Sequence, residues 1–305
     1  MIWAAIPLAA LAAPWVVEAA RRPMSDKLRQ NAEGQFADLP RGKTHYRWHG
    51  PKDGPVAVAI HGLTTPSYVW DGLIPHLTGA GFRVLSYDIF GRGLSDRPRG
   101  AQDTDFFLDQ LEALLADQGI DGPVTLIGNS MGSAISTAFA AKHPIRVRQA
   151  VLLVPAGMGH DLGAVAAFTR KTPVIGDWLM MAFYPGKIRK AAEAERALPS
   201  SVPQIGARQE AELRCRGFLR SVTASLRGAL AQELEAEHKA LAKSGVPVVA
   251  VWGADDTVIP ISCKPVLERW NPNATHVVLP GAGHGLVYTR TDDLAADLLP
   301  LMIKG

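Results

Sequence analysis

The chain has 305 residues, of which 47% are hydrophobic and 20% charged, and its formal net charge at pH 7 is +3. This composition supports a large buried core and excludes an intrinsically disordered chain. Lysine and arginine are scattered along a nearly balanced sequence, so no nucleic-acid partner is expected. The two cysteines, Cys215 and Cys263, lie far apart and outside any metal-binding spacing, so neither a disulfide framework nor a metal site is expected.

The first 17 residues are almost wholly apolar and are followed by Glu18, Arg21 and Arg22. This run is short for a membrane span, contains two prolines and lacks the basic start of a secretory signal. Three interpretations of residues 1–23 stay open: a segment that associates with the membrane surface, an atypical signal, or an extension upstream of a start at Met24. We favour peripheral membrane association, which places the protein in the cytoplasm or on a membrane rather than outside the cell.

Downstream, short apolar runs alternate with segments of helical character. Strands are expected at residues 44–49, 55–60, 82–87, 124–127, 147–154, 246–252 and 275–279. Helices are expected at residues 70–78, 105–118 and 133–141, near 263–270, and from about 292 onward. Alternation of strands and helices with short connections predicts a doubly wound, mostly parallel α/β sheet.

The alternation is interrupted by residues 156–244, which lack strand-like runs and are typical of several helices broken by prolines. We interpret this stretch as a helical cap inserted into a core formed by residues 24–155 and 245–305. Apolar side chains gather in the cap, and most of them are expected to pack it onto the core. Trp178, Met181 and Phe183 of this group are predicted to bind an apolar substrate.

One strand and one helix are joined by the tight turn Gly128-Asn129-Ser130-Met131-Gly132, a G-x-S-x-G pattern. A serine at the apex of such a turn takes a strained backbone conformation, and the glycines keep side chains out of the crowded space. The hydroxyl of Ser130 is then lifted clear of the sheet, and the Met131 amide points from a helix N-terminus toward any oxyanion formed there. Taken alone, the pattern also fits an ordinary turn with a helix-capping serine.

Two further reactive side chains follow predicted strands. Asp256 comes after the strand at 246–252, and His284 comes after the strand at 275–279. Catalytic groups in such sheets gather beyond the carboxyl ends of the strands, and the chain order Ser, Asp, His is typical of one class of hydrolase triads. Asp255 is the alternative for the acid, and Asp161 is a less favoured candidate from another strand end.

Five segments together resemble the α/β-hydrolase superfamily, and the resemblance covers the chain from Thr44 onward. These segments are H-G-L at 61–63, Y-D-I-F-G-R-G-L-S-D at 87–96, G-N-S-M-G at 128–132, W-G-A-D-D-T-V-I-P at 252–260 and G-A-G-H at 281–284. The resemblance implies that Ser130 is a nucleophile, His284 its general base and Asp256 the acid that orients the base.

The same resemblance implies that the backbone amides of Leu63 and Met131 form an oxyanion hole and that His61 positions the loop carrying Leu63. Haloalkane dehalogenases and epoxide hydrolases of this superfamily have an aspartate in place of the serine, so their chemistry is not expected here.

The sequence therefore predicts a serine hydrolase that cleaves carboxylic esters of fairly apolar small molecules through an acyl-enzyme and uses no cofactor. The sequence is similar to those of microbial esterases and monoacylglycerol-lipase-like members of the superfamily. One alternative is a C–C bond hydrolase of aromatic ring-cleavage products, which has a similar serine turn but usually a longer glycine-rich loop than residues 61–66 provide. The other is a non-catalytic binding protein with the same fold.

Overall fold

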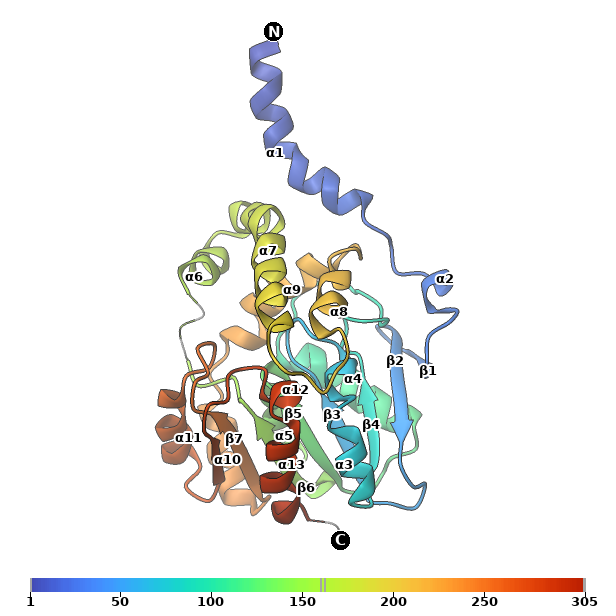
Figure 1. The fold of residues 1–305 in the computed structure, drawn as a ribbon, viewed down its shortest axis with the longest axis vertical. Coiled ribbons are helices and arrows are strands. Elements are labelled where there is room, and N and C mark those ends of the chain that lie inside the picture. Colours follow the sequence, from blue (N-terminus) through green and yellow to red (C-terminus); the bar gives the residue numbers. More distant parts are fainter. Residues whose placement is uncertain (1, 160, 162, 304–305) are drawn as a thin grey trace.

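A single eight-stranded sheet forms the centre of the computed structural model, which describes residues 2–159, 161 and 163–303 (Figure 1). The strands are β1 (Gln35–Leu39), β2 (Gly42–His49), β3 (Val56–Ile60), β4 (Arg83–Tyr87), β5 (Val124–Asn129), β6 (Val147–Leu153), β7 (Val248–Gly253) and β8 (Thr275–Leu279). Their order is β1-β2-β4-β3-β5-β6-β7-β8. The pairs that involve β2 are antiparallel and all others are parallel, so the predicted mostly parallel sheet is confirmed.

Helices cover both faces of the sheet. One face carries α4 (Thr104–Asp117), α5 (Met131–Lys142), α10 (Glu235–Ser244) and α11 (Lys264–Trp270). The other face carries α3 (Ile74–Gly79), α12 (Leu286–Thr289) and α13 (Thr291–Leu298). This double covering explains why the central strands are continuous apolar runs rather than alternating ones.

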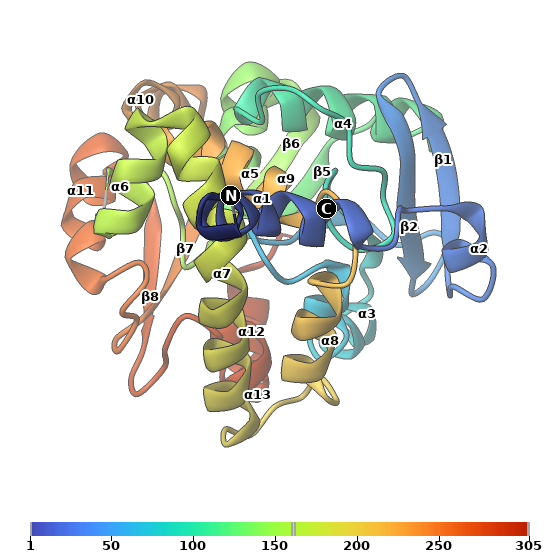
Figure 2. The same ribbon diagram turned by 90° about the horizontal axis from the view of Figure 1, so that it is seen from above.

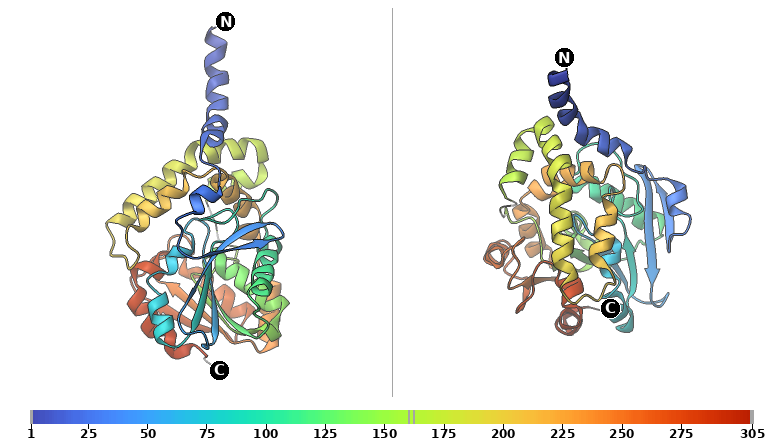
Figure 3. Two further views of the ribbon diagram at one scale, coloured as in Figure 1. Left: turned by 90° about the vertical axis from the view of Figure 1, so that its right-hand side faces the viewer. Right: turned by 45° about the horizontal axis from the view of Figure 1, so that its top comes forward.

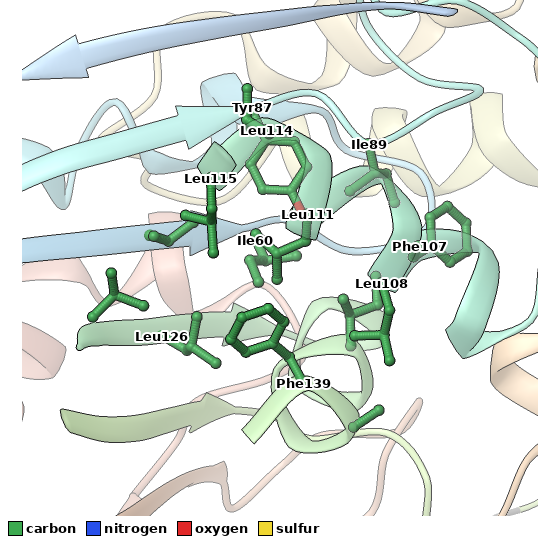
Figure 4. Close-up of a cluster of buried hydrophobic side chains, with 14 of the residues drawn as sticks. Ile60, Tyr87, Ile89, Phe107, Leu108, Leu111, Leu114, Leu115, Leu126 and Phe139 are labelled. Carbon is green, nitrogen blue, oxygen red and sulfur yellow. The ribbon is translucent and has the colours of Figure 1, made fainter. Parts of the chain in front are cut away.

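The core is divided by the sheet into two main clusters. In β3, Val58 and Ile60 pack with α4 and α5, whereas Ala57 and Ala59 face the opposite cluster. Figure 4 shows the first cluster, in which side chains of α4 and Phe139 of α5 lie against the side chains of three strands. Burial of this apolar area is the main contribution to the stability of the sheet and its covering helices, which hold the strand ends in place.

Four helices lie over the carboxyl ends of the parallel strands, above the sheet in Figure 1. These cap helices are α6 (Ala164–Lys171), α7 (Pro173–Arg196), α8 (Ile205–Glu212) and α9 (Phe218–Arg227). Helices α7 and α9 share a cluster of their own around Met180, Phe218 and Val222, to which Leu213 adds from just after α8. The cap helices therefore form a separate packing layer at the edge of the sheet where ligands gather.

The cap ends earlier than the boundary at residue 244 predicted from the sequence. Helix α10 packs on α5 and α11, its Leu241 belongs to the core, and the ring of His238 stacks on Trp270 at 6.1 Å between centroids. The reason is topological, since two parallel neighbours such as β6 and β7 need a crossover, usually through a helix on the sheet. Helix α10 provides that helix, and the insertion lies between β6 and α10.

The N-terminal helix α1 (Ile2–Ala20) projects beyond the cap end of the molecule, and the short α2 (Asp26–Arg29) follows it (Figure 1). Seen from above, α1 passes over the N-terminal part of α7, which it contacts (Figure 2). None of the helices in the described part of the chain combines the length and the apolar character needed to cross a membrane.

Candidate active site

Ser130 lies at the apex of the turn between β5 and α5, with the strained backbone angles φ 55° and ψ −115°. Its amide donates to the carbonyl of Leu153 at 2.9 Å, which ties the turn to the neighbouring strand. A Cβ atom added to Gly132 would collide with the backbone carbonyl of Ile60, and one added to Gly128 would collide with the carbonyl of Gly132. The turn can close this tightly only because both positions are glycine.

His284 and Asp256 complete a hydrogen-bonded chain that begins at Ser130. The Ser130 Oγ lies 3.1 Å from His284 Nε2, and His284 Nδ1 lies 2.8 Å from Asp256 Oδ2. An ionised carboxylate only accepts hydrogen bonds, so the imidazole proton is on Nδ1 and Nε2 is free to accept from the serine hydroxyl. The structure thus brings together the three side chains that the sequence analysis named as nucleophile, base and acid.

The Asp256 side chain is fully buried and accepts three hydrogen bonds, one from His284 and two from backbone amides of its own turn. Its Oδ1 accepts from the amides of Val258 at 2.7 Å and Ile259 at 2.9 Å. Burial by itself raises the pKa of Asp256, but the hydrogen bond and charge of His284, together with these amides, outweigh it and lower the pKa below the ordinary value. Asp256 is therefore ionised at neutral pH, as an acid that stabilises an imidazolium must be.

The two alternative acids do not reach His284. The side chain of Asp255 is exposed, although it is adjacent to Asp256 in sequence. Asp161 is also exposed, and its Oδ1 accepts from the backbone amide of Gly163 at 2.7 Å. Asp256 is thus the one carboxylate of the three that lies in the hydrogen-bonded chain.

The loop after β3 lies against the serine turn. A Cβ atom on Gly62 would lie 3.3 Å from the Ser130 Cβ, so backbone and serine are in close contact. His61 is completely buried, accepts from the Ile89 amide at Nε2 (2.9 Å) and has its Nδ1 2.8 Å from the Gly62 carbonyl. Because Nε2 is the acceptor, Nδ1 carries the proton and donates. Burial lowers the pKa of His61 to about 4, so it stays neutral.

The hydrogen bond from His61 to the Gly62 carbonyl fixes the direction of the Leu63 amide. In a trans peptide the carbonyl and the N–H point in opposite directions, so a held Gly62 carbonyl sets where the Leu63 N–H points. Arg92 holds the following carbonyl, since its Nε donates to Leu63 O at 2.9 Å. The structure therefore places His61 and Arg92 on either side of the amide that was predicted to bind an oxyanion.

Arg92 received no role in the sequence analysis, although it lies within one of the recognised segments. It is fully buried, its remaining guanidinium nitrogens donate to Phe90 O, Gln102 and Ser225, and burial lowers its pKa to about 9. Ser225 belongs to α9, so this one side chain links the loop beside Ser130 to the cap. No local sequence signal marks such a role, because the partners come from distant segments.

A cavity of about 860 Å³ lies between the sheet and the cap helices, with Ser130 and His284 in its wall. Helix α7 contributes one stripe of apolar side chains, including Met180, Phe183 and Ile188, and α9 contributes Leu226. The dimensions and apolar character are those of a small-molecule site.

Of the three residues predicted to bind substrate, Phe183 lines this cavity, whereas Trp178 and Met181 lie outside its lining. The indole nitrogen of Trp178 instead donates to the carbonyl of Leu11 in α1 at 2.9 Å. On a helix, residues three or four positions apart share a face, so the apolar residues at 178–184 of α7 cannot all face the cavity. Met180 and Tyr184 take the cavity positions beside Phe183.

Comparison with known proteins agrees with this fold. The sequence model of the alpha/beta hydrolase fold family matches residues 55–291, so the chain belongs to that family and is a hydrolase of it. The expected superfamily is thereby confirmed.

Individual relatives differ in what they catalyse. A haloalkane dehalogenase of Mycobacterium marinum is 28% identical over 245 residues, which cover 76% of this chain and 79% of the relative. A bifunctional esterase/perhydrolase of Acinetobacter calcoaceticus is 27% identical over 269 residues, which cover 83% and 94%. The structure of an enol-lactonase from Burkholderia xenovorans LB400 superposes with a TM-score of 0.71 at 20% identity, over 87% of this chain and 98% of that one. The family thus defines a hydrolase, and the particular reaction has to be inferred from the site.

Proposed function

We propose that this protein is a serine hydrolase that cleaves carboxylic esters of fairly apolar substrates through an acyl-enzyme. The observation that carries the proposal is the hydrogen-bonded chain Ser130–His284–Asp256, whose serine end opens into a largely apolar cavity. The esterase among the relatives supports the proposal by analogy. A dehalogenase function is not favoured, because the apex of the turn is Ser130 rather than an aspartate.

The reaction begins when Ser130 Oγ attacks the ester carbonyl while His284 Nε2 takes its proton. Asp256 stabilises the imidazolium that forms, and the imidazolium returns the proton to the leaving alcohol as the tetrahedral intermediate collapses. A water molecule then attacks the acyl-serine while His284 takes its proton, and His284 returns that proton to Ser130 Oγ as the carboxylic acid leaves. Each step uses side chains that are within hydrogen-bonding distance in the structure.

The negative charge on the tetrahedral intermediate is assigned to the amides of Leu63 and Met131. Met131 is the first residue of α5, where backbone N–H groups have no intrahelical acceptor and the helix dipole favours an anion. His61 and Arg92 act as positioning residues for the Leu63 amide through the carbonyls that they bind. Two fixed donors of this kind supply several kcal/mol of transition-state stabilisation in comparable sites, about 3 to 4 kcal/mol for one donor.

The test is hydrolysis of p-nitrophenyl esters from acetate to palmitate by the wild type and Ser130→Ala. We expect turnover that peaks at one acyl length and is abolished in the variant, and a fluorophosphonate that adds mass at Ser130 in the wild type alone. Circular dichroism of both proteins controls for folding. A folded wild type that hydrolyses no ester and is not labelled contradicts the proposal. Bleaching of a yellow dienol ring-cleavage product would then favour the C–C bond hydrolase.

A further inference from the structure

The base of α1 is fixed to the cap by buried and backbone contacts. Glu18 is buried, and its carboxylate accepts from the Gly217 amide at 2.6 Å and from Arg21 at 2.8 Å. The backbone of Arg22 pairs with the 214–216 segment, with its amide 3.0 Å from the Arg214 carbonyl. Helix α1 is therefore held in a defined direction, and Figure 3 shows it rising from the cap end of the molecule.

Residues 11–17 of α1, next to this fixed base, expose large apolar side chains. Leu11 is 61% exposed and Val16 is 63% exposed, and Trp15 and Val17 are also exposed. Each such side chain gains about 1.5–3 kcal/mol when it is fully removed from water. A helix held outward with this surface indicates a partner that covers it.

The cap continues the same surface. Val174 is 75% exposed and Ile175 is 59% exposed, and both are in the first turn of α7. They lie three to four residues before Trp178, which is the residue that bonds to the Leu11 carbonyl, so they are one helical turn from the contact with α1. Residues 11–17 of α1 and 174–175 of α7 therefore form one apolar surface, which we call the docking face.

The cavity opens next to the docking face. Phe168 of α6 and Phe183 of α7 line the cavity and are at the same time exposed to solvent. Phe183 also stacks edge-on against the ring of Trp178, at 5.9 Å between centroids. The apolar lining of the cavity is thus continuous, through Trp178, with the apolar surface outside.

The cap, which carries part of the docking face, has an excess of positive charge. Residues 156–232 contain eleven lysines and arginines against six acidic residues, whereas the whole chain has an excess of only three. Arg170 and Lys171, in the last turn of α6 just before Val174, are exposed and form no salt bridge within the described part of the chain. Exposed apolar side chains with a tryptophan, bordered by arginine and lysine, match the chemistry of an anionic lipid surface.

We propose that the docking face binds an anionic lipid bilayer, with residues 11–17 of α1 embedded among the lipids and the cavity mouth facing them. An apolar ester then passes from the bilayer into the cavity without crossing water. The lipid binding rests on the docking face alone, and the delivery of substrate rests on the proposed esterase function.

The experiment is co-sedimentation of the full chain with vesicles of phosphatidylcholine alone and of phosphatidylcholine with 30% phosphatidylglycerol. We expect binding to the anionic vesicles to be at least tenfold tighter and to weaken with salt. The double variants Trp15→Asp with Val16→Asp, and Val174→Asp with Ile175→Asp, should each weaken binding about tenfold or more. Acidic residues are favourable in the first turn of α7, so the second variant should fold.

Two further variants complete the design. Arg170→Gln with Lys171→Gln should remove most of the preference for anionic vesicles and leave the weak binding to neutral ones. The matched control is Ile145→Asp, because Ile145 is 90% exposed and lies on η2 (Pro144–Arg146), directly before β6 and so at the opposite edge of the sheet from Ser130. This control should bind like the wild type.

Binding that is absent in the wild type, or equal in all variants and the control, overturns the proposal. Self-association that depends on Trp15 without vesicle binding would assign the docking face to a second copy of the chain and would also overturn it. The esterase function is tested separately, since all variants should hydrolyse water-soluble p-nitrophenyl esters at the wild-type rate while losing activity on esters embedded in anionic vesicles. Vesicle binding by a wild type that hydrolyses no ester would leave the docking face in place and refute the enzyme assignment.

Discussion

His284 donates its Nδ1 proton to the buried Oδ2 of Asp256 at 2.8 Å, and Asp256 has no exposed side-chain surface. This pair determines which imidazole nitrogen faces Ser130. In Asp256→Asn the amide can donate to Nδ1, so the imidazole proton moves to Nε2, which can then no longer accept from the serine. We expect kcat to fall by about 10³–10⁴-fold with little change in KM.

Steady-state kinetics on the best p-nitrophenyl ester measures this effect, and Asp255→Asn is the matched control. Asp255 is adjacent in sequence but exposed, so its variant should stay within about twofold of the wild type. Equal losses in both variants would show that the wrong carboxylate has been assigned to the base.

His61→Ala should lower kcat by about 10- to 100-fold and change KM much less. The variant leaves the Gly62 carbonyl unheld, so the Leu63 amide loses its fixed direction, while the loop still closes the cavity. The expected loss is smaller than the 10²–10³-fold that follows removal of an oxyanion donor, because the amide itself remains. His61→Gln, which can still donate to that carbonyl, should recover part of kcat. A loss confined to KM or to thermal stability would mean that His61 has no part in positioning the amide.

Gly132→Ala should abolish soluble expression or reduce stability by more than about 4 kcal/mol. Its methyl group would collide with the Ile60 carbonyl, which belongs to a central strand and cannot shift cheaply. Gly186→Ala is the control, since that glycine lies within α7 with no neighbour near a new Cβ atom. It should raise stability by about 0.5–1 kcal/mol in thermal unfolding. A well-folded Gly132→Ala protein would contradict the tight packing of the turn.

The parts of the structure that were predictable have local signals. Buried strands are continuous apolar runs, and Ser130, Asp256 and His284 are each marked by glycines and by a place directly after a strand. The edge strand β1 was missed, because its half-exposed residues carry neither an apolar run nor a clean alternation. The role of Arg92 and the cavity positions on α7 depend on how distant segments pack, which no short window of sequence records.

The same limit explains the misplaced cap boundary. Helix α10 has an acidic first turn and an overall polar sequence, so nothing local separates it from the cap helices before it. Only its packing through Leu241 and His238 assigns it to the core. The cavity-lining positions among residues 178–184 could not be predicted for a related reason, since the sequence shows that this segment is apolar but not which side of α7 faces the serine.

Glu212 makes the stability of the cap depend on pH. This carboxyl group is buried in α8, where it accepts from the Gly93 amide at 3.0 Å and lies 3.5 Å from Arg97. Burial raises the pKa of Glu212 from 4.5 to about 7, an effect larger than the opposing one of Arg97. Between these two pH values the folded protein retains a proton that the unfolded chain has released.

The stabilisation of the folded protein by protonated Glu212 is therefore fully present below about pH 4.5 and is lost as the pH rises through about 7. A pKa difference of this size between the unfolded and folded protein corresponds to a loss of about 3 kcal/mol in the free energy of unfolding. Glu212→Gln keeps an acceptor for the Gly93 amide and cannot ionise, so the variant should gain stability relative to the wild type as the pH is raised from 5 to 8. Urea unfolding at each pH measures the difference, with the exposed Glu33→Gln as control. A difference that stays constant across this range would mean that Glu212 is already ionised at pH 5, stabilised by Arg97 more strongly than burial disfavours it.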